Sequence, residues 1–150
     1  QSELSGANLS NAEHYNTQLR RANLSEANLS GADLQKAQLT HTNLHKANLA
    51  SAWLAGANLK EANLSEANLF RSTLHGANLQ DADLSAANLM EASLIKANLQ
   101  NVDLQDADLN KTILFKASVS KSALIEAQLC LTSLPDYTMH NRDCEQTRSI

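Results

Sequence analysis

The sequence has few of the residues on which large cores, flexible linkers or collagen-like chains depend. Only 3% of its 150 residues are aromatic, and it contains four glycines and one proline. These numbers exclude a core built on large rings, a collagen-like chain and Pro-rich recognition tracts. Apolar residues occur only in short runs, so no membrane-spanning segment is expected. The net charge of -4 lacks the basic excess that nonspecific nucleic-acid binding requires.

What the chain does have is a repeat with a period of five residues. Leucine occupies 25 of the 27 positions reached in steps of five from Leu4 to Leu134, and the exceptions are His14 and Val119. The position two before each of these is Ala in 19 of 27 cases and otherwise small, and the position just before is Asn or Asp in 15. A period of five fits neither a helix nor a flat strand. It predicts a solenoid that turns every five residues and encloses the leucine and the small residue.

The four glycines indicate where the turns lie. Gly6, Gly31, Gly56 and Gly76 all stand two residues after a central leucine. A type II turn needs a positive φ at its third residue, where glycine is favoured. The other repeats carry mainly charged or amide residues in this slot, and we expect their turns to be of a different type, without positive φ.

The run from Ala22 to Leu34, ANLSEANLSGADL, resembles the pentapeptide-repeat proteins, and the resemblance covers about residues 2–136. It implies an all-β fold, a right-handed quadrilateral β-helix with four pentapeptides per coil and about seven coils. The Leu-centred, Asn-rich repeats are most similar to cyanobacterial members. Residues 20 apart would then stack, so that asparagines and alternating charges form columns along the rod. The β-helix is expected over residues 1–136, with residues 137–150 as a C-terminal cap or tail.

The ends of the repeat raise separate expectations. His14 replaces a core leucine, and we expect a local bulge there. The tail is expected to cover the last coil, with a short helix that has Ser133 as its N-cap and Pro135 in its first turn. Cys130 and Cys144 form either one disulfide or two free thiols. A disulfide would suit the periplasm or a thylakoid lumen, and free thiols a cytoplasmic protein. Gln1 is consistent with a removed leader or with a trimmed chain.

The sequence shows few signs of catalytic or metal-binding chemistry. CxxC, HExxH, GxSxG and Gly-rich phosphate motifs are absent. His41, Glu61 and Asp81 share one predicted column and could hold a cation weakly, but an exposed polar column is the favoured interpretation. The sequence therefore predicts no enzyme, no catalytic residue, no cofactor and no metal site.

One predicted surface differs from the rest because large apolar residues gather in its outward slots. This candidate protein-contact patch consists of Trp53, Phe70, Met90, Ile95, Ile113 and Phe115. Exposed apolar patches often mark interaction sites. The alternative is that the tail packs on Ile113 and Phe115 and that the others are scattered single residues.

The leading functional hypothesis is a non-enzymatic structural or protein-interaction scaffold with an unknown protein partner. No nucleic acid or membrane is expected as a partner, and the rod is expected to be a monomer or an end-to-end dimer. The family resemblance implies an alternative, a DNA-mimic modulator of DNA gyrase. That activity depends on a strongly negative surface, whereas lysines interrupt the acidic columns here: Lys46, Lys96, Lys111 and Lys116.

Overall fold

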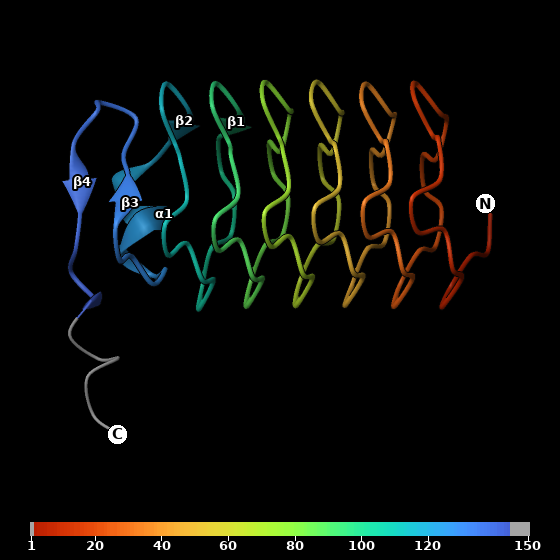
Figure 1. Ribbon diagram of the computed structural model, residues 1–150, viewed down its shortest axis with the longest axis horizontal. Coiled ribbons are helices and arrows are strands. Elements are labelled where there is room, and N and C mark those ends of the chain that lie inside the picture. The colour runs from red at the N-terminus through yellow and green to blue at the C-terminus, as the bar shows by residue number, and fades with distance from the viewer. Residues whose placement is uncertain (1, 145–150) are drawn as a thin grey trace.

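The computed structural model describes residues 2–144, which form a rod of stacked coils with the cap at one end (Figure 1). Its helix and its strands of two residues all lie between residues 98 and 140. They are β1 (Asn98–Leu99), β2 (Ser118–Val119), α1 (Lys121–Ile125), β3 (Thr132–Ser133) and β4 (Met139–His140). Strands β1 and β2 pair in parallel, and β3 and β4 form an antiparallel hairpin.

Most of the rod is held by single-residue parallel bridges, because a side of five residues with a turn at each corner leaves one residue free to pair. Each bridge joins residues 20 apart, as in Asp33 to Trp53 and Trp53 to Thr73. Backbone hydrogen bonds run along the rod at every level, and the Leu54 amide donates to the Thr73 carbonyl at 2.7 Å. Four pentapeptides per coil are thereby confirmed. The bridged column from Glu13 to Ser133 contains seven residues, one for each coil.

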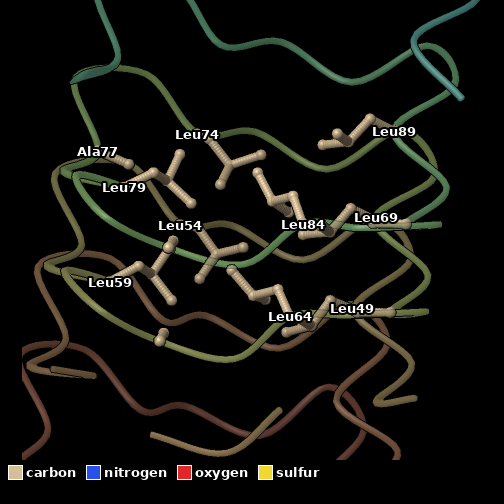
Figure 2. Packing of buried hydrophobic residues seen from close by; sticks show 14 of the residues in the cluster. Leu49, Leu54, Leu59, Leu64, Leu69, Leu74, Ala77, Leu79, Leu84 and Leu89 are labelled. Atoms are coloured by element: carbon tan, nitrogen blue, oxygen red, sulfur yellow. The ribbon is translucent and has the colours of Figure 1, made fainter. Parts of the chain in front are cut away.

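The interior of the rod is filled by the repeated leucines and small residues. From Leu24 to Leu79 every central leucine has 0% of its surface exposed. Figure 2 shows Leu54 stacked on Leu74, Leu59 on Leu79 and Leu64 on Leu84. Burial of each such side chain contributes roughly 1.5–3 kcal/mol of transfer free energy. The core is therefore long, narrow and dry, with each coil stabilised by its two neighbours.

The turns correct one expectation from the sequence. From Asn11 to Lys116, every non-glycine residue two positions after a central leucine has a φ between 53° and 60°. The glycines in the same slot have φ values of 62° to 67°. The prediction that turns without glycine avoid positive φ was therefore wrong. The backbone bonds between coils impose one turn conformation throughout, whatever side chain stands there.

Outward side chains form the expected columns. The side-chain amide of Asn28 donates to the side-chain oxygen of Asn8. The Asn48 side chain donates in the same way to Asn28, and the Asn68 side chain to Asn48, at 3.1 to 3.4 Å. In the charged columns, Lys46 lies 3.5 Å from Glu66. Arg71 and Lys111 reach Glu91 from either side, at 2.7 and 3.5 Å. Exposed pairs of this kind stabilise the fold by only about 0–1 kcal/mol each.

The first coil keeps its regular path at His14, so the expected bulge was wrong. Glu13 pairs with Asp33, the His14 amide donates to the Asp33 carbonyl at 2.7 Å, and Asn16 has the same φ as other turn residues. The imidazole is half-buried, and its Nε2 has no hydrogen-bond partner among the described residues. The ring fits the leucine slot because the backbone bonds to the second coil fix the chain on both sides of it.

The helix lies earlier than the sequence predicted. Helix α1 replaces one side of a late coil, and the Ser120 hydroxyl caps it by accepting a hydrogen bond from the Ala123 amide at 3.1 Å. The expected helix with Ser133 as N-cap was wrong. Ser133 belongs to β3 and bridges to Ile113, with its amide donating to the Thr112 carbonyl at 2.9 Å. Its backbone is committed to coil stacking and cannot begin a helix.

Residues 137–144 of the predicted tail close the last coil and are fixed by a disulfide between Cys130 and Cys144, whose Cα atoms lie 4.7 Å apart. Residues 145–150 of that tail lie outside the described residues. The Leu129 amide donates to the Asp143 carboxylate at 2.8 Å, and the Asp143 amide donates to the Leu129 carbonyl at 3.1 Å. These bonds satisfy backbone groups that the end of a solenoid would leave unpaired. Within residues 2–144, no helix has the length and apolar character that crossing a bilayer requires.

Candidate protein-contact surface

One of the four sides of the rod differs from the others in its side chains. We call it the Trp53 side, and define it by the bridged column and its two flanking corners. The column contains Glu13, Asp33, Trp53, Thr73, Ser93, Ile113 and Ser133. No asparagine stands in this column, so the amide-to-amide ladders of the other sides are missing here. Its side chains remain directed outward from a backbone that the stacked coils hold in place.

Trp53 is the most exposed large residue of this column. It has 58% of its surface accessible, whereas Leu54, the next residue, is fully buried. Ile113, three coils further on, is 41% exposed. The alternation of inward and outward residues thus leaves the indole ring of Trp53 exposed, on a backbone that the neighbouring coils hold in place.

Phe70 and Met90 lie at the corner that enters the Trp53 side. Each is half-buried, and each backbone amide donates to the asparagine two residues earlier, at 3.2 and 3.0 Å. The Arg71 guanidinium lies 4.8 Å from the centre of the Phe70 ring while it also binds Glu91. The Arg71 hydrogen bond lowers the pKa of Glu91, and Lys111 acts in the same direction. This corner therefore combines apolar surface with a compensated charge ladder.

Ile95 and Phe115 lie at the opposite corner, and the cap reaches this end. The Phe115 ring contacts Tyr137, with ring centres 4.0 Å apart, and Lys116 lies 5.1 Å from the Phe115 centre. Phe115 thus packs against the C-terminal segment through Tyr137, as the alternative interpretation of the patch expected. The six predicted residues share one side of the rod, but the structure divides them into an open part around Trp53 and a part beside the cap.

Sequence reasoning missed a residue at the other end of this side. Tyr15 is 54% exposed and borders a hollow together with Trp53. It stands in the same column as Ile95 and Phe115, 80 and 100 residues earlier, so the 20-residue period contained the signal. The Tyr15 hydroxyl raises the pKa of Lys36 by hydrogen bonding, and the Lys36 ammonium lies 5.4 Å from the centre of the Tyr15 ring.

The histidine and carboxylate column lies away from the Trp53 side and is internally paired. His41 Nδ1 lies 3.2 Å from Glu61, and Asn101 donates to Asp81 at 3.0 Å. Lys60 adds a cation near both carboxylates. Across residues 2–144, no group of three or more His, Cys, Asp or Glu side chains is arranged to hold a metal ion.

Comparison with known proteins identifies the class to which this rod belongs. Eight copies of the pentapeptide-repeat family model match residues 2–40, 42–81, 67–106 and 92–129. The chain belongs to the pentapeptide-repeat proteins. Its fold is the all-β, right-handed quadrilateral β-helix of that family. No curated protein sequence matches the chain.

Several solved pentapeptide-repeat proteins are similar to the chain. Rfr23 of the cyanobacterium Cyanothece 51142 is 41% identical with a TM-score of 0.56, over 57% of this chain and 58% of that protein. The similarity therefore spans little more than half of Rfr23. HetL of the cyanobacterium Nostoc sp. strain PCC 7120, a protein involved in heterocyst differentiation regulation, is 32% identical over 93% of this chain and 79% of its own, with a TM-score of 0.33.

A further similar structure is QnrB1, a plasmid-mediated fluoroquinolone resistance protein. It is 19% identical over 90% of this chain and 80% of its own, with a TM-score of 0.53. At this identity the similarity shows the shared fold alone. The family is a repeat scaffold, and the function of this chain has to be argued from its own surfaces.

Proposed function

We propose that this protein is a non-enzymatic scaffold that binds a protein partner through the Trp53 side. The observation that carries the proposal is the exposed Trp53 ring on a column without an asparagine ladder. Tryptophan is enriched among the residues that dominate binding energy at protein interfaces. An indole that stays in water gives up the favourable burial that a partner surface would supply.

The rigidity of the rod supports the same function. The backbone at Trp53 is bonded to both neighbouring coils, since the Trp53 amide donates to the Ala32 carbonyl at 2.9 Å and the adjacent Leu54 amide donates to the Thr73 carbonyl at 2.7 Å. A backbone that is already fixed loses little further conformational freedom when a partner covers it, so more of the burial energy appears as affinity. Side chains of the same column are spaced by about 4.8 Å, the distance between hydrogen-bonded strands.

The interior gives no alternative place for chemistry. The leucines fill most of the rod, and apart from the half-buried His14 the histidines and carboxylates that could act as acids or bases are spread over its outer sides. Catalysis needs such groups to converge on a site that excludes water. The features of the described residues favour binding through an outer side over catalysis.

The test compares partner capture by the wild type, Trp53→Ser and Ile125→Ser. Ile125 is the matched control because it is 65% exposed and lies on α1, in an apolar hollow at the cap with Leu124 and Leu129. Circular dichroism and thermal melting establish that each variant is folded. Captured proteins from the source organism are then compared after crosslinking.

We expect a partner that is retained by Ile125→Ser and lost by Trp53→Ser. Equal capture by all three proteins would contradict the proposal, because Trp53 would then contribute nothing to binding. Loss only in Ile125→Ser would also contradict it, since binding would then depend on the cap. A Phe115→Ser variant tests how far the contact extends along the Trp53 side, although this change also removes the contact with Tyr137.

We also propose that the protein works in an oxidising compartment, such as the periplasm or a thylakoid lumen. The disulfide between Cys130 and Cys144 supports this proposal, because reducing compartments keep thiol pairs of this kind reduced. The test is alkylation of the protein in freshly lysed source cells. Both cysteines should react only after a reductant is added, and labelling without reductant would contradict the assignment.

A further inference from the structure

The N-terminal end of the Trp53 side carries a hollow of about 280 Å³ whose lining includes two exposed aromatic residues. Tyr15 and Trp53 border it together with Glu13 and Asp33, and Glu13, Asp33 and Trp53 follow one another on successive coils. Gly31 and Asn11 complete the lining at the neighbouring corner. A Cβ at Gly31 would collide with Oδ1 of Asn11, so the glycine allows the asparagine to lie close to this wall.

The two carboxylates of the hollow belong to the acidic side chains that make no ion pair in residues 2–144, unlike the acidic members of the charge ladders. Glu61, Glu66 and Glu91 each lie within 4.0 Å of a basic side chain. No ion pair among residues 2–144 involves Glu13 or Asp33. Asp33 accepts one hydrogen bond through Oδ1, from the Gln35 amide at 3.0 Å. Two stacked negative charges therefore face solvent beside aromatic rings.

Lys36 is a cation of the chain itself that lies over one of the two aromatic rings, that of Tyr15. Its ammonium lies 5.4 Å from the centre of the Tyr15 ring, within the range of a cation–π interaction. Lys36 belongs to the corner and approaches Tyr15 from that side, and it makes no ion pair with Glu13 or Asp33 in the described residues. The carboxylates that line the hollow therefore have no cationic partner from Lys36.

We propose that this hollow binds an arginine side chain of the protein partner; the inference rests on the function proposed above. A guanidinium is planar, stacks on aromatic faces and pairs with carboxylates through several N–H donors. Trp53 supplies the stacking face, and Glu13 and Asp33 supply acceptors on two successive coils. Lysine has the same charge but lacks the planar group, so it would use the carboxylates without the stacking.

The test uses fluorescence, because Trp53 is the only tryptophan of the chain and reports directly on the hollow. The probe is a synthetic peptide, acetyl-(Gly-Arg)₃-amide, titrated into the full chain at low salt. Matched peptides replace each arginine by lysine or by citrulline, which keeps the planar shape but has no charge. We expect saturable binding of the arginine peptide, weaker binding of the lysine peptide and no binding of the citrulline peptide.

The variant pair separates local charge from net charge. Glu13→Gln/Asp33→Asn should weaken binding of the arginine peptide by about tenfold, since two partly exposed ion pairs are lost. Both substitutions keep side-chain oxygen acceptors, and Gln and Asn occupy equivalent slots elsewhere in the rod. The control is Asp103→Asn/Asp106→Asn, which changes net charge equally on another side. Asp103 makes the same backbone contact as Asp33, with the Gln105 amide at 2.9 Å.

Three results would overturn the assignment. These are equal binding of the citrulline peptide, equal binding of the lysine peptide, or equal weakening by the control pair. The natural partner then distinguishes the two proposals. Capture that is lost in Trp53→Ser but unchanged in Glu13→Gln/Asp33→Asn would leave the proposed function standing and remove the arginine site. Capture that is unchanged in both variants would remove both.

Discussion

The turn slot offers a direct test of how the fold controls its backbone. Ala86 has a φ of 53°, is exposed, and lies in the turn two residues after the central Leu84. Gly76 occupies the same slot ten residues earlier, with a φ of 62°, and a Cβ added there would meet no heavy atom within 4 Å. Both amides donate to the next coil, at 2.8 and 2.9 Å. The two sites therefore differ in little except the methyl group.

The expected energies follow from two opposing effects. The left-handed conformation costs an L-residue about 1–2 kcal/mol relative to glycine. Alanine regains about 0.4–1 kcal/mol because it restricts the unfolded chain. Ala86→Gly should therefore stabilise the protein by roughly 0.5–1 kcal/mol, and Gly76→Ala should destabilise it by the same amount.

Urea unfolding followed by circular dichroism measures both changes, with the slope of the transition as a check that the unfolded surface is unchanged. The opposite pair of signs would refute the reasoning. Stabilisation by Gly76→Ala and destabilisation by Ala86→Gly would mean that this slot behaves as an ordinary loop, without a cost for positive φ.

Four further predictions concern the core, the cap, the charge ladder and the alternative function. Leu64→Ala should destabilise the protein by about 2–5 kcal/mol in urea unfolding, because Leu64 is fully buried between two stacked coils; a loss below about 1 kcal/mol would contradict the dry core. Cys130→Ser/Cys144→Ser should destabilise the cap by about 3 kcal/mol, for a loop of 14 residues. Hydrogen exchange should then accelerate in residues 127–144 and not in the middle coils, and uniform acceleration would argue against independent coils. The pKa of Glu91 is lowered by the Arg71 hydrogen bond, so its stabilising effect is present above the ordinary value of 4.5 and is lost as pH falls through the lower folded value. Glu91→Gln should therefore lose less stability than the wild type between pH 7 and pH 3, and equal losses would contradict the pairing. Micromolar protein should leave DNA gyrase supercoiling unchanged, because lysines compensate the acidic columns; inhibition or protection would revive the gyrase hypothesis.

The repeat itself made most of the architecture predictable. Leucine at every fifth position cannot be buried by a helix or a flat strand, so the period alone required a turn at each repeat. The family resemblance supplied the four-sided closure, and the 20-residue columns followed from it, including the ladder from Asn8 to Asn88. The grouping of Trp53 with Ile113 was predictable for the same reason.

The errors arose where one residue was interpreted without its neighbours on the adjacent coil. Glycine was taken as the marker of positive φ, yet Glu26 and Ala86 adopt it because their amides must reach the next coil. Ser133 and Pro135 locally resemble a helix start, but the Ser133 backbone pairs with Ile113. His14 looked like a disruption, although the bonds on both sides of it hold the regular path.

The sequence by itself determined the inward and outward assignment of nearly every residue, since that depends only on a five-residue period and on the transfer of leucine out of water. The tertiary structure alone decided the contacts that the repeat does not fix. Cys144 lies against Cys130 and forms a disulfide with it, and the helix spans Lys121–Ile125 instead of following Ser133. The structure also showed that Tyr15, Glu13, Asp33 and Trp53 line one hollow. Such neighbours depend on hydrogen bonds between coils 20 residues apart, which no local segment of the chain contains.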